Sequence, residues 1–101
     1  MKALLITAET QTIEAVEIVT MADIKKLIGY DTIESDQIGS DGNYLYFDEE
    51  CFLRGSKGRF QIDTMIPVSG TGIIVGTVDD GAAFKDVTIG VDELRQRIKY
   101  L

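Results

Sequence analysis

The 101-residue chain contains no histidine and no tryptophan, and it has only one cysteine and one proline. Without histidine there is no imidazole to act as a general base, to complete a Ser–His–Asp triad or to bind a metal ion. A single cysteine, Cys51, excludes an internal disulfide, a four-cysteine zinc site and a CxxC pair. The absence of an internal disulfide fits a reducing compartment, and we expect a cytoplasmic protein.

Long apolar runs are also missing. No stretch approaches the roughly 18–20 residues of a membrane-spanning helix, and the apolar run at the N-terminus is too short for a signal peptide. The net charge of −7 disfavours nucleic acid and membrane surfaces as partners, because both are anionic. The phosphate-loop pattern is absent, and Ser69-Gly70-Thr71-Gly72 leads into a strand rather than a helix. The sequence therefore indicates no membrane contact, no direct nucleic-acid binding and no cofactor.

The spacing of apolar residues predicts a single α+β domain over residues 1–101. It comprises a mainly antiparallel sheet of about six or seven strands with two short helices packed against it. Strands are expected at 2–8, 12–19, 32–38, 44–47, 60–64, 72–78 and 84–89, with a further strand beginning at 51–53. Helices are expected from Thr20 to a glycine cap at Gly29 and over 90–101, and a turn is expected at 79–81.

The densest run of β-branched residues is Ile73-Ile74-Val75, which is typical of a central strand buried on both faces. The strand at Leu4 to Ile6 is also apolar on both faces. Two helices are few to cover such a sheet, so we expect a symmetric homodimer that buries the rest.

The segment between Leu27 and Leu53 contains no basic residue. Its acids are Asp31, Glu34, Asp36, Asp41, Asp48, Glu49 and Glu50. Acids of this kind often occupy solvated turns and protect edge strands. They could also bind Ca²⁺ or Mg²⁺, but the spacing of a calcium loop is absent and we expect no metal. A further hypothesis is a surface from Asp31 to Glu50 that binds a basic protein partner, as a DNA mimic does.

The charge changes sign directly afterwards, where Arg54, Lys57 and Arg59 alternate with glycine and serine. Arginine suits phosphate, and glycine lets the backbone approach a ligand closely. One hypothesis is therefore a site for a small anionic ligand, with tyrosines nearby to stack on a base. Its residues would be Arg54, Lys57, Arg59, Ser69, Gly70, Thr71, Gly72, Tyr44 and Tyr46. The alternative is internal charge pairing between the arginines and Asp48 to Glu50.

Several short motifs resemble an uncharacterised family of small proteins carried largely by bacteria, their phages and their plasmids. They are Leu27-Ile28-Gly29, Asp48-Glu49-Glu50, Leu53 with Gly55, and Gly72-Ile73-Ile74-Val75-Gly76-Thr77. The resemblance covers about Leu4 to Ile89. It implies no particular activity, but it does imply a mobile-element context, in which small proteins often block host defence by binding something.

Three functions remain open from the sequence. The first is a non-enzymatic protein that sequesters a small anionic ligand such as a signalling nucleotide. The second is an acidic module that blocks a basic host protein. The third is a small enzyme that uses carboxylates or Cys51, although no catalytic partner is visible beside them. We expect the first of these, without catalysis.

Overall fold

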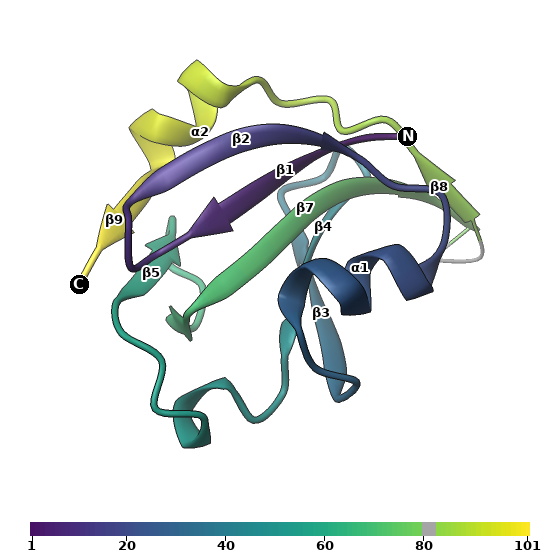
Figure 1. Cartoon of the computed structure of the whole chain (residues 1–101). Helices are drawn as coiled ribbons and strands as arrows, with labels where there is room; N and C mark the ends of the chain where they lie inside the picture. Colours follow the sequence, from purple (N-terminus) through teal and green to yellow (C-terminus); the bar gives the residue numbers. More distant parts are fainter. Residues whose placement is uncertain (80–82) are drawn as a thin grey trace.

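The computed structural model describes residues 1–79 and 83–101, which form two antiparallel sheets and two helices (Figure 1). The predicted α+β fold is confirmed. The large sheet contains β1 (Lys2–Thr7), β2 (Thr12–Glu17), β3 (Ile33–Ile38), β4 (Asn43–Asp48), β7 (Thr71–Val78) and β8 (Ala83–Lys85). The small sheet contains β5 (Arg59–Ile62), β6 (Val68–Ser69) and β9 (Ile98–Tyr100). The helices are α1 (Met21–Ile28) and α2 (Val91–Arg97), and Cys51–Leu53 forms a 3₁₀ turn, η1.

Strand β7 lies at the centre of the large sheet, as the sequence predicts. The strand order is β2-β1-β7-β4-β3, and β8 pairs with the end of β7. Ile73, Ile74 and Val75 have no exposed surface. β1 and β2 form an antiparallel hairpin, with Leu4 opposite Ala15. The β-branched run is therefore buried on both faces, and the acidic strand β3 is left at one edge.

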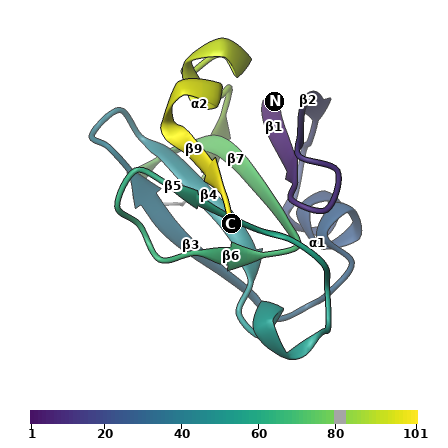
Figure 2. The same ribbon diagram turned by 90° about the vertical axis from the view of Figure 1, so that its left-hand side faces the viewer.

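The two faces of the large sheet are covered by different elements. Ile73 and Val75 pack with Ile24 and Ile28 of α1 on one face. On the other face Ile74 packs with residues of the small sheet and α2. Figure 2 shows β5, β6 and β9 stacked in front of the large sheet. The bare apolar faces that motivate the homodimer are thus covered within one chain, and the dimer stays a prediction.

Gly72 allows the two sheets to approach each other. It lies on the central strand, beneath the fully buried ring of Phe60 from the small sheet. A Cβ at position 72 would lie only 2.7 Å from Phe60 Cζ and 3.0 Å from Leu45 Cδ1. The missing side chain therefore makes room for the aromatic ring.

Helix α1 begins and ends as the sequence predicts. The Asp23 carboxylate accepts the backbone N–H groups of Thr20 and Val19, at 3.0 and 2.8 Å. These hydrogen bonds, that from Thr20 first, lower the pKa of Asp23. Gly29 has a left-handed φ of 92°, and its N–H donates to the Lys25 carbonyl at 2.7 Å.

Two sequence predictions are wrong in detail. Residues 51–53 form η1 rather than the start of a strand, because three apolar residues alone do not specify an extended backbone. The second helix ends at Arg97, and the next residues form β9 by pairing with Phe60–Ile62. Leu101, at the end of the predicted helix, instead follows β9 and is 57% exposed.

The expected strand at 84–89 is also shorter than predicted. Only its first residues belong to β8, after which the Val87 N–H donates to the Lys2 carbonyl and Thr88 binds the buried amide of Asn43. The expected turn at 79–81 extends beyond the described residues. None of the helices in the described ranges is long and apolar enough to cross a membrane.

Candidate functional site

Arg54 is the first residue of the predicted anion site, and its guanidinium is already occupied by acids of the same chain. Its Nε donates to Asp48 Oδ2 at 2.8 Å, and one terminal nitrogen lies 3.4 Å from Glu50 Oε2. The same nitrogen donates to the Thr32 hydroxyl at 3.2 Å. The guanidinium carbon stacks 4.0 Å from the centre of the Tyr30 ring. For Arg54, internal charge pairing is what the structure shows.

Asp48 anchors this cluster from a buried position at the end of β4. Only 3% of the residue is exposed, and its carboxylate also accepts the Thr32 hydroxyl and the Glu50 N–H. Burial alone would raise the pKa of Asp48. The hydrogen bonds from Arg54, Thr32 and Glu50 outweigh burial and hold the pKa below its usual value. Asp48 and Arg54 therefore form an ionised structural pair, and the positive charge of Arg54 is already balanced within the chain.

The glycine turn lies beside Arg54, but its backbone donors are used within the chain. Ser69 and Thr71 line the same small cavity as Arg54, and its volume of about 30 Å³ matches roughly one water molecule. The Ser69 N–H donates to the buried Cys51 Sγ at 3.4 Å. The Gly70 N–H donates to the Gly58 carbonyl at 3.2 Å. A nucleotide does not fit this space.

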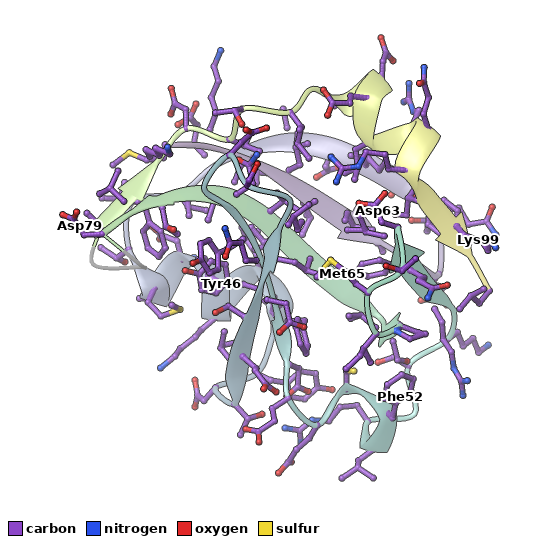
Figure 3. The ribbon with its side chains drawn as sticks, turned by 180° about the vertical axis from the view of Figure 1, so that it is seen from behind. Tyr46, Phe52, Asp63, Met65, Asp79 and Lys99 are labelled. Atoms are coloured by element: carbon purple, nitrogen blue, oxygen red, sulfur yellow. The ribbon has the colours of Figure 1, made fainter. Side chains whose placement is uncertain are left out.

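The remaining residues of the predicted anion site do not line the cavity beside Arg54, although Arg59 lies opposite Ser69 in the β5–β6 ladder. Arg59 places its guanidinium carbon 5.1 Å from the centre of the exposed Phe52 ring. Lys57 is exposed in the loop before β5. Tyr46 is buried on the α1 face, and burial raises its pKa. In Figure 3, Tyr46 lies within the body of the molecule and Phe52 lies on η1 at its lower margin.

Tyr44 and Gly72, the last two residues of the predicted anion site, also lie outside the cavity beside Arg54. Tyr44 packs with the same cluster as Tyr46, and Gly72 is buried in the ladder of β7. Neither residue adjoins the cavity beside Arg54. Within the described ranges, no group of three or more cysteine or acidic residues is arranged to hold a metal ion.

The acids of β3 and β4 form a second candidate site, which we call the acidic hairpin (residues 31–50). Asp48 and Glu50 pair with Arg54. Within residues 1–79 and 83–101, no ion pair involves the remaining acids of the hairpin, Asp31, Glu34, Asp36, Asp41 and Glu49. All of them except the half-buried Asp36 are exposed. Because a strand rises about 3.3 Å per residue, this negative surface extends along roughly 20 Å of sheet edge.

A concave groove lies elsewhere, between the β1–β2 turn, α2 and β9. Its volume is about 420 Å³, within the range of small-molecule sites. It is lined by Gln11, Thr12, Ile13, Arg95, Ile98 and Tyr100. Burial raises the pKa of Tyr100, while the nearby Arg95 opposes this rise. Sequence reasoning missed the groove because its residues come from separate segments.

These features define a class of small α+β protein, with two stacked antiparallel sheets and a carboxylate-rich hairpin at one sheet edge. The family model of a domain of unknown function, DUF3846, matches residues 1–99, and the chain belongs to this family. The expectation of an uncharacterised family is confirmed. No curated protein and no solved structure matches the chain.

Proposed function

We propose that this protein is a non-enzymatic binding module that presents the acidic hairpin to a basic protein partner. The observation that carries the proposal is the row of carboxylates on β3 and its flanking turns, which take part in no ion pair among residues 1–79 and 83–101. Unpaired carboxylates at a surface create a negative potential that attracts a basic partner and speeds its encounter.

The setting of this function rests on the family resemblance of the sequence motifs. We place the protein on a mobile genetic element and in the cytosol, where it blocks a host protein. Proteins that bind nucleic acid carry basic surfaces, and a rigid row of carboxylates competes for such surfaces as a DNA mimic does. The rigidity comes from β4, which holds β3 in register along its whole length.

The proposal predicts that position matters as well as net charge. Glu34→Gln combined with Asp36→Asn removes two charges from the acidic hairpin. Glu9→Gln combined with Glu14→Gln removes two exposed charges from the hairpin of β1 and β2 at the opposite edge of the sheet. The first variant should bind poly-L-lysine about three- to tenfold more weakly than wild type, because each exposed ion pair contributes up to about 1 kcal/mol. The second should change affinity less than about twofold.

Fluorescence titration at several salt concentrations measures both effects. Wild-type affinity should fall steeply as salt rises, and the hairpin variant should show a shallower dependence. Equal losses in the two variants would mean that poly-L-lysine responds to total charge, and the acidic hairpin would lose its role.

Binding of a small anionic ligand is the second candidate function. The groove beside Arg95 suits such a ligand better than the small cavity beside Arg54 does. In that case Arg95→Ala should weaken binding about tenfold, since a hydrogen bond between charged groups is worth about 1.5–3 kcal/mol. Lys26→Ala, which removes an exposed cation from α1 on the opposite face of the large sheet, is the matched control. Calorimetry with a panel of nucleotides measures the change. Absence of heat from every nucleotide would exclude that panel as ligands.

A further inference from the structure

In the part of the chain that the structure describes, no strand lies beside the outer edge of β3. β3 ends the large sheet, and β4 is the strand paired with it among the described residues. In an antiparallel ladder, residues alternate between pairs that exchange hydrogen bonds and pairs whose backbone groups point away. The register therefore determines which groups of β3 face solvent.

The Glu49 N–H donates to the Thr32 carbonyl at 2.6 Å, so this pair belongs to the hydrogen-bonded set. The register pairs Glu34 with Phe47 and Asp36 with Leu45 in the same set. The backbone groups of Glu34 and Asp36 are consequently directed at β4. Those of Ile33, Ser35 and Gln37 are directed outward.

The other side of β4 supports this assignment. The Thr77 N–H donates to the Gly42 carbonyl at 2.7 Å, which places Tyr44 and Tyr46 in hydrogen-bonded pairs with β7. Alternate residues of β4 must then bond to β3, as the register requires.

The outward groups form a template for one more strand. The Ile33 N–H already donates to the Asp31 carbonyl at 3.0 Å. The N–H and C=O of Ser35 and Gln37, together with the Ile33 carbonyl, are left facing outward. Extended peptides bind to such edges through main-chain hydrogen bonds, and their side chains supply the specificity.

We propose that β3 binds an extended segment of its partner as an added antiparallel strand, with arginine or lysine at alternate positions facing Glu34 and Asp36. This inference rests on the proposed function and specifies its partner. Residues opposite Glu34 and Asp36 in the added strand lie in non-hydrogen-bonded pairs, where side chains approach most closely. Two cations spaced two residues apart therefore meet two carboxylates on one face of the sheet.

A second copy of the chain does not suit this edge. Antiparallel pairing of two β3 strands about Ser35 would place Glu34 of each copy directly opposite Asp36 of the other. Like charges in directly opposite positions destabilise a sheet. The other edge of the large sheet, β2, lies beside α2 (Figure 1). Charge thus selects a basic strand as the occupant of the β3 edge.

The test uses the wild-type protein and a short peptide of alternating arginine and threonine. In the proposed register the threonine backbone groups face β3 and the arginine backbone groups face solvent. N-methylation of the threonine backbone nitrogens should weaken binding about tenfold or more, because it removes the N–H groups that donate to the edge of β3. N-methylation of the arginine backbone nitrogens preserves the side-chain charge and leaves the threonine N–H donors in place. It should therefore change affinity less than about threefold.

Isothermal titration calorimetry separates the possible results. Equal, salt-sensitive binding of all three peptides would overturn strand addition. The acidic hairpin would then be a surface that binds basic peptides through charge alone. Absence of binding by any of them, with poly-L-lysine also failing to bind, would overturn both this inference and the proposed function. Tight binding that distinguishes the two methylated peptides supports the added strand.

A variant of the protein provides an independent check. Ser35→Pro removes an outward N–H from an edge strand, a position where proline is tolerated because that N–H takes no part in the ladder. The variant should lose about as much affinity for the unmodified peptide as threonine methylation causes. Unchanged affinity in the folded variant would count against the inference.

Discussion

Replacing Phe60 with alanine is expected to lower the free energy of unfolding by about 3–5 kcal/mol, the usual cost of removing a buried aromatic ring. Phe60 has no exposed surface and pairs with Val68 and Tyr100 in the small sheet. Its ring packs in the core between the small sheet and the large one. The loss reflects both the apolar surface returned to water and the cavity left between the sheets.

Phe52→Ala is the matched control, because it removes the same ring from a half-exposed position on η1. Its expected cost is below about 1 kcal/mol, which is mainly the contact with the Arg59 guanidinium. Urea denaturation followed by circular dichroism measures both variants. Similar losses in the two variants would mean that the small sheet does not depend on Phe60 for its packing.

Asp48→Ala is expected to lower the free energy of unfolding by about 2–3 kcal/mol. The substitution removes the acceptor of Arg54, of the Thr32 hydroxyl and of the Glu50 N–H at once. A donor left unsatisfied in a partly buried site loses its hydrogen bond and bears its desolvation cost. Arg54 keeps 28% of its side chain exposed and can still contact water, which limits the loss.

Glu50→Ala separates burial from charge in this cluster. Glu50 pairs with the same guanidinium but is 48% exposed, so its removal should cost less than about 1 kcal/mol. Urea midpoints of the two variants give the comparison. Equal costs would contradict the central position of Asp48.

The pH dependence of stability provides a second measurement on Asp48. Its pKa is lower in the folded chain than in the unfolded one, where the usual value is about 3.9. The unfolded state therefore takes up the proton first as pH falls. The stabilisation is complete above the unfolded pKa and is lost as pH falls through the folded pKa. Asp48→Asn should flatten the fall in melting temperature below about pH 5.

Local patterns in the sequence predict much of the fold. The capping spacing of Thr20 and Asp23 and the glycine at 29 determine the ends of α1, and these interactions span only a few residues. The run Ile73 to Val75 predicts a central strand because no exposed position suits three apolar side chains in succession.

Other elements depend on distant partners that the sequence does not reveal. Ile98, Lys99 and Tyr100 alternate in polarity, which fits a strand as well as the end of an amphipathic helix. Residues 98–100 form a strand rather than a helix because they pair with the edge of β5 through backbone hydrogen bonds. The same holds for the sites. The acidity between 31 and 50 and the pairing of the arginines with Asp48 to Glu50 are open to prediction from the sequence, whereas the outward-facing groups of β3 follow from strand register.

The contact between Gly72 and Phe60 has a consequence for how this family can evolve. The space above residue 72 is filled by an aromatic ring from a strand that precedes it in sequence, and Leu45 closes the remaining side. A larger residue at 72 can become fixed only after a smaller one has appeared at 60, because the added side chain would otherwise displace the Phe60 ring and force the sheets apart. Homologues should therefore carry compensated pairs at these positions, and divergence at either position alone should be rare.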